Sequence, residues 1–134
     1  MTLIDFIKNN EVDYSCNRIT ADMISDFENK VSVHFGAQLK KYLVDYGYLG
    51  YKYVELFGIN SLQGMNSDMV KKTVRLHEMF EKTKALIAVE DQGDGDYYLV
   101  DTDDMVYRFV LANNELEAQN IDLFEYILQR FETA

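Results

Sequence analysis

The chain has 134 residues, of which 48% are hydrophobic and 13% aromatic, and its formal net charge is -10 at pH 7. This length predicts one domain spanning residues 1-134, and the apolar content excludes a disordered chain despite the charge. No apolar run approaches the roughly 20 residues of a membrane helix, and no signal-peptide pattern opens the chain. The single cysteine, Cys16, cannot form an internal disulfide. These features predict a cytoplasmic protein that neither enters nor crosses a membrane.

The negative charge is concentrated at the C-terminal end of the sequence. Residues 1–84 contain 11 acidic and 11 basic side chains, whereas residues 85–134 contain 12 acidic side chains and only Arg108 and Arg130 as cations. A field of this sign repels nucleic acid and anionic membranes, and it attracts basic proteins. A strongly acidic surface also keeps a protein soluble without any partner. Charge alone therefore leaves both interpretations open.

Helices and short extended segments alternate through the first half of the chain, as judged from apolar spacing and capping residues. We predict helices at 2–9, 20–30, 36–46 and 67–83, capped where a side chain is available by Thr2, Thr20 and Ser67, an extended segment at 31–35, and one or two strands at 48–58 broken near Gly50. Residues 11–18 have the composition of a polar link, and residues 58–64 that of a loop.

Residues 85–111 contain three apolar runs separated by two acidic turns. The runs Leu86–Val89, Tyr97–Val100 and Met105–Leu111 predict three antiparallel strands. Both turns, at 91–96 and 102–104, have the aspartates and glycines of tight reversals. A polar connection at 112–119 and a final helix capped by Asn120 complete the chain. This order predicts an α+β fold, with an antiparallel or mixed sheet covered by about four to five helices.

The first acidic turn raises the alternative of a metal site. Asp91, Asp94 and Asp96 offer hard oxygen ligands. A helix-loop-helix calcium site needs ligands at positions 1, 3 and 5 and a glutamate at position 12. Here Gly93 occupies position 3 and Thr102 occupies position 12. We therefore expect a solvated turn, with no metal ligand and no cofactor.

Catalytic signatures are missing from the sequence. His34 and His77 belong to no H-E-x-x-H motif, and no G-x-S-x-G turn or reactive-cysteine signature is present. We expect His34 to face outward and His77 to make a local hydrogen bond beside a helix stripe. Because two histidines leave few ways to assemble a triad, we expect no catalytic residue. A metal-dependent enzyme is the less favoured alternative.

A cluster of tyrosines precedes the middle of the chain, at Tyr46, Tyr48, Tyr51 and Tyr53. Tyrosines at helix ends and in strands are typical of half-buried packing, but they also anchor protein interfaces. Nucleic-acid stacking would need interleaved lysines and arginines, and only Lys52 is present. If the cluster binds a partner, a protein is therefore favoured.

Several short motifs resemble one known family. The third predicted helix contains Leu39–Leu43 (LKKYL) and closes with Tyr46-Gly47, and a later strand pair reads Gly95–Asp101 (GDYYLVD) followed by Val106-Tyr107. These motifs resemble the SUKH superfamily, which includes the fungal Smi/Knr-type cell-wall assembly regulators and many bacterial immunity proteins. The resemblance spans roughly residues 20–134, although Phe35-Gly36 replaces the family's Leu-Pro pair.

The resemblance implies a non-enzymatic binding domain. For a small chain of this kind it implies an immunity protein that neutralises a cognate bacterial toxin, often a nuclease, and the alternative is a regulatory scaffold of the fungal type. Nuclease domains are commonly basic, so an acidic protein suits such a partner. The candidate partner-binding residues are Asp91, Asp94, Asp96, Asp101, Asp103, Asp104, Tyr48 and Tyr51. Asp96 and Asp101 also belong to the family signature, which makes a scaffold role their alternative.

Overall fold

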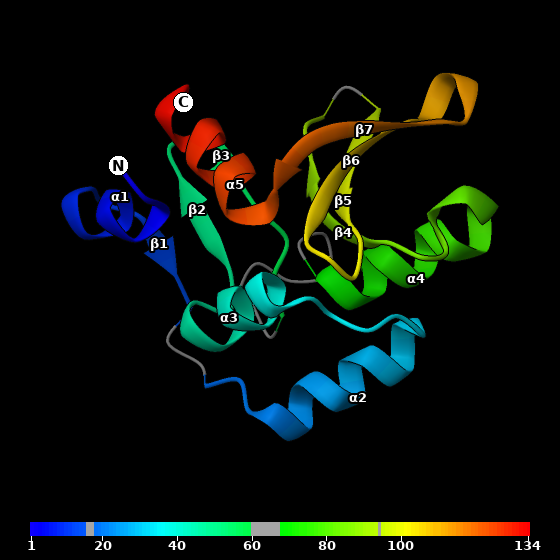
Figure 1. The fold of residues 1–134 in the computed structure, drawn as a ribbon, viewed down its shortest axis with the longest axis horizontal. Coiled ribbons are helices and arrows are strands. Elements are labelled where there is room, and N and C mark those ends of the chain that lie inside the picture. Colours follow the sequence, from blue (N-terminus) through cyan, green and yellow to red (C-terminus); the bar gives the residue numbers. More distant parts are fainter. Residues whose placement is uncertain (16–17, 60–67, 94) are drawn as a thin grey trace.

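The computed structural model describes residues 1–15, 18–59, 68–93 and 95–134 (Figure 1). Its helices are α1 (Leu3–Asn9), α2 (Ala21–Val31), α3 (Ala37–Asp45), α4 (Met69–Met79) and α5 (Leu123–Glu132), with short 3₁₀ turns η2 (Glu81–Thr83) and η3 (Leu111–Asn113). Its strands are β1 (Asp13–Tyr14), β2 (Leu49–Tyr51), β3 (Val54–Glu55), β4 (Ile87–Asp91), β5 (Asp96–Val100), β6 (Met105–Val110) and β7 (Glu115–Asp122). The predicted α+β class is confirmed.

The strands form two antiparallel sheets within one domain. The small sheet has the order β1-β2-β3, and the large sheet is a meander with the order β4-β5-β6-β7. In the large sheet Tyr98 lies opposite Arg108, which in turn lies opposite Glu117. Directly opposite residues of an antiparallel sheet share a face. These three side chains are therefore on one face, and their sequence neighbours Tyr97 and Phe109 are on the other.

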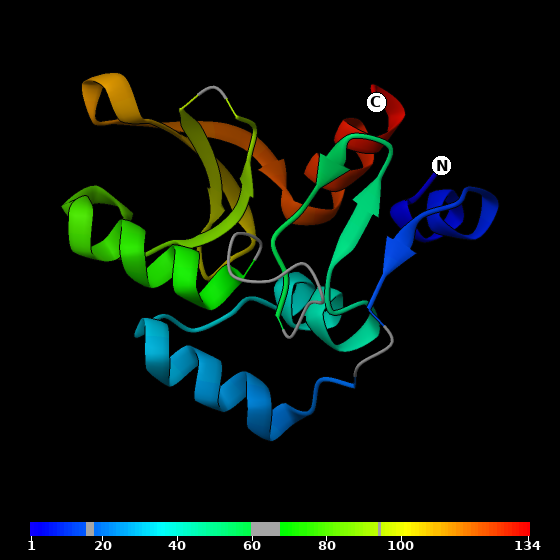
Figure 2. The same cartoon turned by 180° about the vertical axis from the view of Figure 1, so that it is seen from behind.

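Helix α5 lies between the two sheets (Figures 1 and 2). Tyr126 stacks on Tyr98 of the large sheet with ring centroids 5.1 Å apart. Phe131 packs against Tyr51 of the small sheet at 5.6 Å. Because α5 is covered from two sides, its buried residues extend well beyond a single stripe; they are Leu123, Tyr126, Ile127, Leu128 and Phe131.

Helix α4 covers the other face of the large sheet. There Phe80, which ends α4, contacts Phe109 of β6 with ring centroids 4.9 Å apart. The buried hydroxyl of Thr73 accepts the N–H of Ala88 in β4 at 3.0 Å. Helix α2 packs on the outside of α4, and α1 packs against α5. The large sheet is thus enclosed between α4 and α5, which explains why most of β4 is buried.

The turn between β5 and β6 is bonded to two helices through Asp104. Asp104 is 6% exposed, and its carboxylate accepts the N–H groups of Gln38 at 2.9 Å and Leu39 at 3.0 Å in the first turn of α3. Its carbonyl accepts the N–H of Leu123, the first residue of α5, at 2.9 Å. A carboxylate at a helix N-terminus satisfies unpaired N–H groups and interacts favourably with the helix dipole. This one residue therefore sets the positions of α3 and α5 relative to the sheet.

Gly36, the N-cap residue of α3, makes room for this carboxylate. A Cβ atom at Gly36 would lie 2.4 Å from Oδ1 of Asp104. Any other residue at position 36 would displace the carboxylate from the two N–H groups that it accepts. We call the contact of Asp104 with the first turns of α3 and α5 the Asp104 junction. Gly36, of the Phe35-Gly36 pair noted in the sequence, is part of it.

Most helices begin and end where the sequence predicts, but several other expectations were wrong. Residues 115–122 form strand β7, although a polar connection was predicted at 112–119. The sequence did not indicate this strand because β7 lies at the sheet edge and shows no regular apolar alternation. Asp122 caps α5 in place of Asn120, whose backbone φ is 59°. The break between β2 and β3 comes at the turn formed by residues 52–53 and not near Gly50, which lies within β2.

Helix α4 also differs from its predicted bounds. Asp68 caps α4 by accepting the N–H of Lys71 at 2.9 Å, and the predicted cap, Ser67, lies outside the described residues. The helix ends at Met79, and η2 continues the predicted span to Thr83. Residues 13–14 of the predicted polar link pair with β2 as strand β1. The predicted extended segment at 31–35 has the expected alternation of buried and exposed side chains, but Val31 is the last residue of α2 and Ser32 has a left-handed φ of 58°. Residues 33–35 belong to none of the strands in the part of the chain that the structure describes.

The Asp104 junction predicts a contrast between two neighbouring aspartates. Asp104→Asn keeps the shape of the side chain but removes an acceptor oxygen and the charge, so we expect a loss of about 1 to 3 kcal/mol in the free energy of unfolding. Asp103→Asn, at an exposed position in the same turn, should change it by less than about 0.5 kcal/mol. Urea denaturation measures both, and equal effects would contradict the junction.

Candidate binding surface

A crevice opens between the small sheet and the end of β4. Its volume is about 510 Å³, and its lining includes Tyr53, Glu55, Glu90, Asp91 and Arg130. Phe57, which follows β3, joins the two walls by donating its N–H to the carbonyl of Val89 in β4 at 2.8 Å. The crevice therefore lies where the two sheets and α5 meet.

A buried ion pair forms the inner wall of the crevice. Glu90 is 2% exposed, and it accepts Nε of Arg130 at 2.8 Å and Nη2 at 2.7 Å. The hydroxyl of Tyr126 also donates to Glu90, and Nε2 of Gln92 donates to Tyr126 at 3.2 Å. Burial, with the charge of Glu90, raises the pKa of Tyr126, so the phenol remains a donor. These bonds hold β4 against α5, at Tyr126 in the middle of the helix and at Arg130 near its C-terminal end.

The outer rim of the crevice carries an exposed aromatic side chain and two exposed carboxylates. Tyr53 is 69% exposed, and Glu55 and Asp91 are exposed beside the crevice. The hydroxyl of Tyr53 donates to the carbonyl of Thr133 at 3.4 Å, which orients the ring over the end of α5. Glu90 and Arg130 neutralise each other, so among the described lining residues Lys72 is the one further cation that the rim carboxylates face. A tyrosine beside exposed carboxylates is suited to contact a basic protein surface.

Four of the predicted partner-binding aspartates accept hydrogen bonds: Asp91 accepts the N–H of Gly93 in its own turn at 2.7 Å, and the other three are bonded more extensively. Asp96 is 6% exposed and pairs with Arg108, whose Nε lies 2.8 Å from its carboxylate. Asp101 accepts two backbone N–H groups of its own turn and the hydroxyl of Tyr107 at 3.2 Å. Asp104 accepts the N–H groups of α3, so the expectation that it presents an acidic surface was wrong. For Asp96 and Asp101 the contacts favour the alternative that these two residues stabilise the fold and do not bind the partner.

The other predicted aspartates do not form one surface. Asp91 and Asp103 are both exposed, but they belong to consecutive turns of the meander. The Asp91 turn joins β4 to β5 and the Asp103 turn joins β5 to β6, so the two turns lie at opposite ends of the large sheet (Figure 1). Asp94 lies outside the described residues. Of the two turns, only the one that follows Asp91 lies beside the crevice.

The two tyrosines predicted as anchors are half-buried in packing contacts. Tyr51 lies edge-on to Phe6 with ring centroids 5.1 Å apart, and it also contacts Phe131. Tyr48 lies so close to Gly58 that a Cβ atom there would be 2.3 Å from that of Tyr48. Tyr53 is the exposed member of the 46–53 tyrosine cluster because it occupies the two-residue turn between β2 and β3, as Lys52-Tyr53 between two apolar runs would have suggested.

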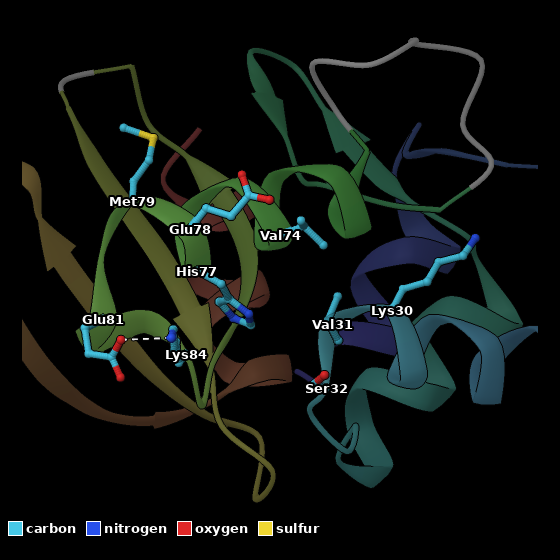
Figure 3. A pocket seen from close by; sticks show the side chains of 9 residues that line it. All are labelled: Lys30, Val31, Ser32, Val74, His77, Glu78, Met79, Glu81 and Lys84. Atoms are coloured by element: carbon cyan, nitrogen blue, oxygen red, sulfur yellow. Dashed lines mark ion pairs between the residues drawn. The ribbon is translucent and has the colours of Figure 1, made fainter.

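A second hollow, of about 620 Å³, separates the C-terminal ends of α2 and α4 (Figure 3). His77 points into this region and bonds to the carbonyl of Leu86 at 2.8 Å, which confirms the predicted local hydrogen bond. Glu81 and Lys84 pair with each other at 2.9 Å, and Lys30 points away from them (Figure 3). Charges of both signs line this hollow, so it does not extend the acidic character of the crevice.

Comparison with known proteins gives one match that covers nearly the whole chain. The sequence profile of the SUKH_5 family, described as SMI1-KNR4 cell-wall, matches residues 2–132. The chain belongs to the SUKH family. The resemblance seen in the motifs is thereby confirmed, and this family is generally non-catalytic and suggests protein–protein interaction. No curated protein matches the chain.

The SUKH signature residues of this protein are largely structural. Tyr42 of the LKKYL motif is buried, donates to the carbonyl of Phe57 at 2.6 Å and accepts the N–H of Leu49 at 3.2 Å. Burial raises its pKa, which keeps the hydroxyl protonated. Asp101 and Tyr107 bond to each other at the second turn. The signature therefore identifies the fold, and the crevice rim lies mostly outside it.

The described residues of this SUKH domain form neither a metal-binding cluster nor a membrane-spanning helix. Among residues 1–15, 18–59, 68–93 and 95–134, no group of three or more His, Cys, Asp or Glu side chains is arranged to hold a metal ion. Over the same ranges, none of the helices has the length and apolar character needed to span a bilayer.

The buried pair predicts a large effect for one arginine. Arg130→Met leaves Glu90 as a buried, unpaired carboxylate, so we expect a loss of about 3 to 5 kcal/mol in the free energy of unfolding. Lys41→Met, which removes the exposed pair with Asp45 on α3, should cost far less, because solvent screens an exposed pair. Adding Glu90→Met to Arg130→Met should restore part of the loss. Denaturant titration of the three variants measures these losses. A loss for Arg130→Met no larger than that for Lys41→Met would contradict the role of the buried pair.

Proposed function

We propose that this SUKH protein is a non-enzymatic immunity protein that binds and neutralises a basic toxin domain. The observation that carries the proposal is the crevice rim, where exposed Tyr53 lies beside the exposed carboxylates of Glu55 and Asp91. Membership of the SUKH family supports protein binding as the activity. The excess of acidic residues in the C-terminal part supports a positively charged partner.

The rim residues would contribute to binding in different ways. Tyr53 offers a large contact area, and its bond to the carbonyl of Thr133 reduces the entropy that the ring loses on binding. Glu55 and Asp91 would act mainly on the rate of association, because exposed charges steer encounter more than they hold a complex together. The carboxylates of Asp96 and Asp104 are occupied by internal bonds and have no part in this proposal.

Neutralisation of a nuclease would follow from charge. A nuclease holds its polyanionic substrate through a basic surface. An acidic protein bound at that surface would compete directly with the nucleic acid. We infer a cytoplasmic location, because the nucleic acid that such a toxin attacks lies there.

A regulatory scaffold is the second candidate function. The description of the matched family, SMI1-KNR4 cell-wall, favours it. The neighbouring genes distinguish the two candidate functions. A toxin gene immediately beside this one supports immunity, and a gene without such a neighbour supports the scaffold.

The proposal predicts that the protein protects cells from the adjacent toxin. Cells that make the toxin domain should grow when this protein is co-expressed and should die without it. Failure of wild-type protein to rescue growth, although both proteins are made and folded, would exclude immunity to that toxin.

The rim also predicts a position-dependent effect of charge reversal. Asp91→Lys should slow association with the toxin about three- to tenfold and flatten its salt dependence. Asp103→Lys changes the net charge by the same amount at the opposite end of the sheet, so it should leave the association rate close to wild type. Stopped-flow or surface-binding kinetics at several salt concentrations measure both. Equal effects would mean that only total charge matters and would remove the crevice from the proposal.

A further inference from the structure

Strand β7 forms an open edge of the large sheet. The other edge strand, β4, is covered, because Val89 accepts the N–H of Phe57 and Ala88 donates to Thr73. Among the described residues, β6 is the only backbone segment hydrogen-bonded to β7, which runs for 8 residues. Figure 1 shows β7 crossing the molecule at the outer side of the meander.

The open edge has a regular part and an irregular part. Glu115 to Ala118 pair in unbroken register with Val110 to Tyr107 of β6. Beyond them the register shifts, and Asn120 adopts a positive φ of 59°. The side-chain Nε2 of Gln119 donates to the carbonyl of Glu117 at 3.0 Å. A regular stretch of edge strand presents outward backbone groups that can pair with another strand, even where it is short.

Charge determines which strand the edge accepts. Glu115 and Glu117 are exposed on one face of β7, and Leu116 is half-buried on the other. Glu117 also pairs with Arg108 of β6, whose Nη1 lies 3.4 Å from its carboxylate, so Glu115 is the more available charge. The strand contains neither lysine nor proline, the residues that most often protect an edge. A second copy of β7 would bring these carboxylates close to one another, which is unfavourable. A strand with cations on one face and apolar side chains on the other would pair with both faces.

We propose that β7 binds an extended basic segment of the partner protein by strand addition at Glu115–Ala118. This inference rests on the proposed function, since it describes how the partner of that function is held. Glu115 lies at the same end of the large sheet as Asp91, because Val110, opposite Glu115, also lies opposite Asp96. One partner can therefore contact the crevice rim and the β7 edge together. Backbone bonds would give affinity, and alternate side chains would give specificity.

A blocked eight-residue peptide that alternates arginine and valine is the probe. Added to the full-length protein, it should slow amide hydrogen exchange within Glu115–Ala118, as measured by NMR. The same peptide with methylated backbone nitrogens keeps its charges but loses its donors, and it should not protect these amides. The double variant Glu115→Gln, Glu117→Gln should bind the probe roughly three- to tenfold more weakly.

A matched control removes the same charge elsewhere. Glu125→Gln with Glu132→Gln, both exposed on α5, should change affinity for the probe by less than about twofold. Protection at the crevice in place of β7 would overturn strand addition while leaving the proposed function intact. Equal binding of the methylated peptide, protection without peptide at high protein concentration, or no protection at any peptide concentration would also overturn it. These outcomes would indicate charge attraction alone, self-pairing, or a closed edge, respectively.

Discussion

The hydrogen bonds of one buried carboxylate, that of Asp104, connect the parts of this molecule that carry the binding surface. A buried carboxylate is costly unless donors surround it, and here the first turn of α3 supplies two N–H groups. The backbone carbonyl of Asp104 accepts the N–H of Leu123, the first residue of α5. Glu90 binds Tyr126 in the middle of α5 and Arg130 near its C-terminal end. The helix between the two sheets is thus fixed at its start, in its middle and near its end, and the crevice between the sheets has a defined shape.

Much of the fold could be predicted from the sequence, because most elements have one face in the core. The helices at 2–9, 20–30 and 36–46 showed their apolar spacing, and the first three strands of the meander showed apolar runs between turns. Strand β7 was missed because an edge strand is solvated on more than one side and needs no apolar alternation. The caps of α4 and α5 were misassigned because two polar residues of similar capping strength stood close together, and only the backbone path distinguishes them.

The binding surface was harder to predict for a different reason. An aspartate in a turn has the same identity whether its carboxylate faces solvent, as at Asp103, or accepts buried N–H groups, as at Asp104. The pairing of Glu90 with Arg130 joins residues 40 positions apart, so local pattern gives no sign of it. The separation of the two acidic turns, by contrast, follows from the predicted meander alone, since consecutive turns lie at opposite ends of the strand between them. Excess charge in a sequence therefore did not imply one charged surface.

The carboxylates of this protein fall into two groups. Glu90, Asp96, Asp101 and Asp104 bond to side chains or backbone N–H groups that stabilise the fold. Asp91, which accepts the N–H of Gly93 in its own turn, and Glu115 are exposed at one end of the large sheet, and we propose that they meet a basic partner. Amide hydrogen exchange of the protein alone and in complex with the adjacent toxin tests this claim most directly. The account predicts protection at residues 53–55, 90–93 and 115–118, with no change in α2 or at the Asp103 turn. Protection confined to the hollow between α2 and α4, or to the Asp103 turn, would contradict it.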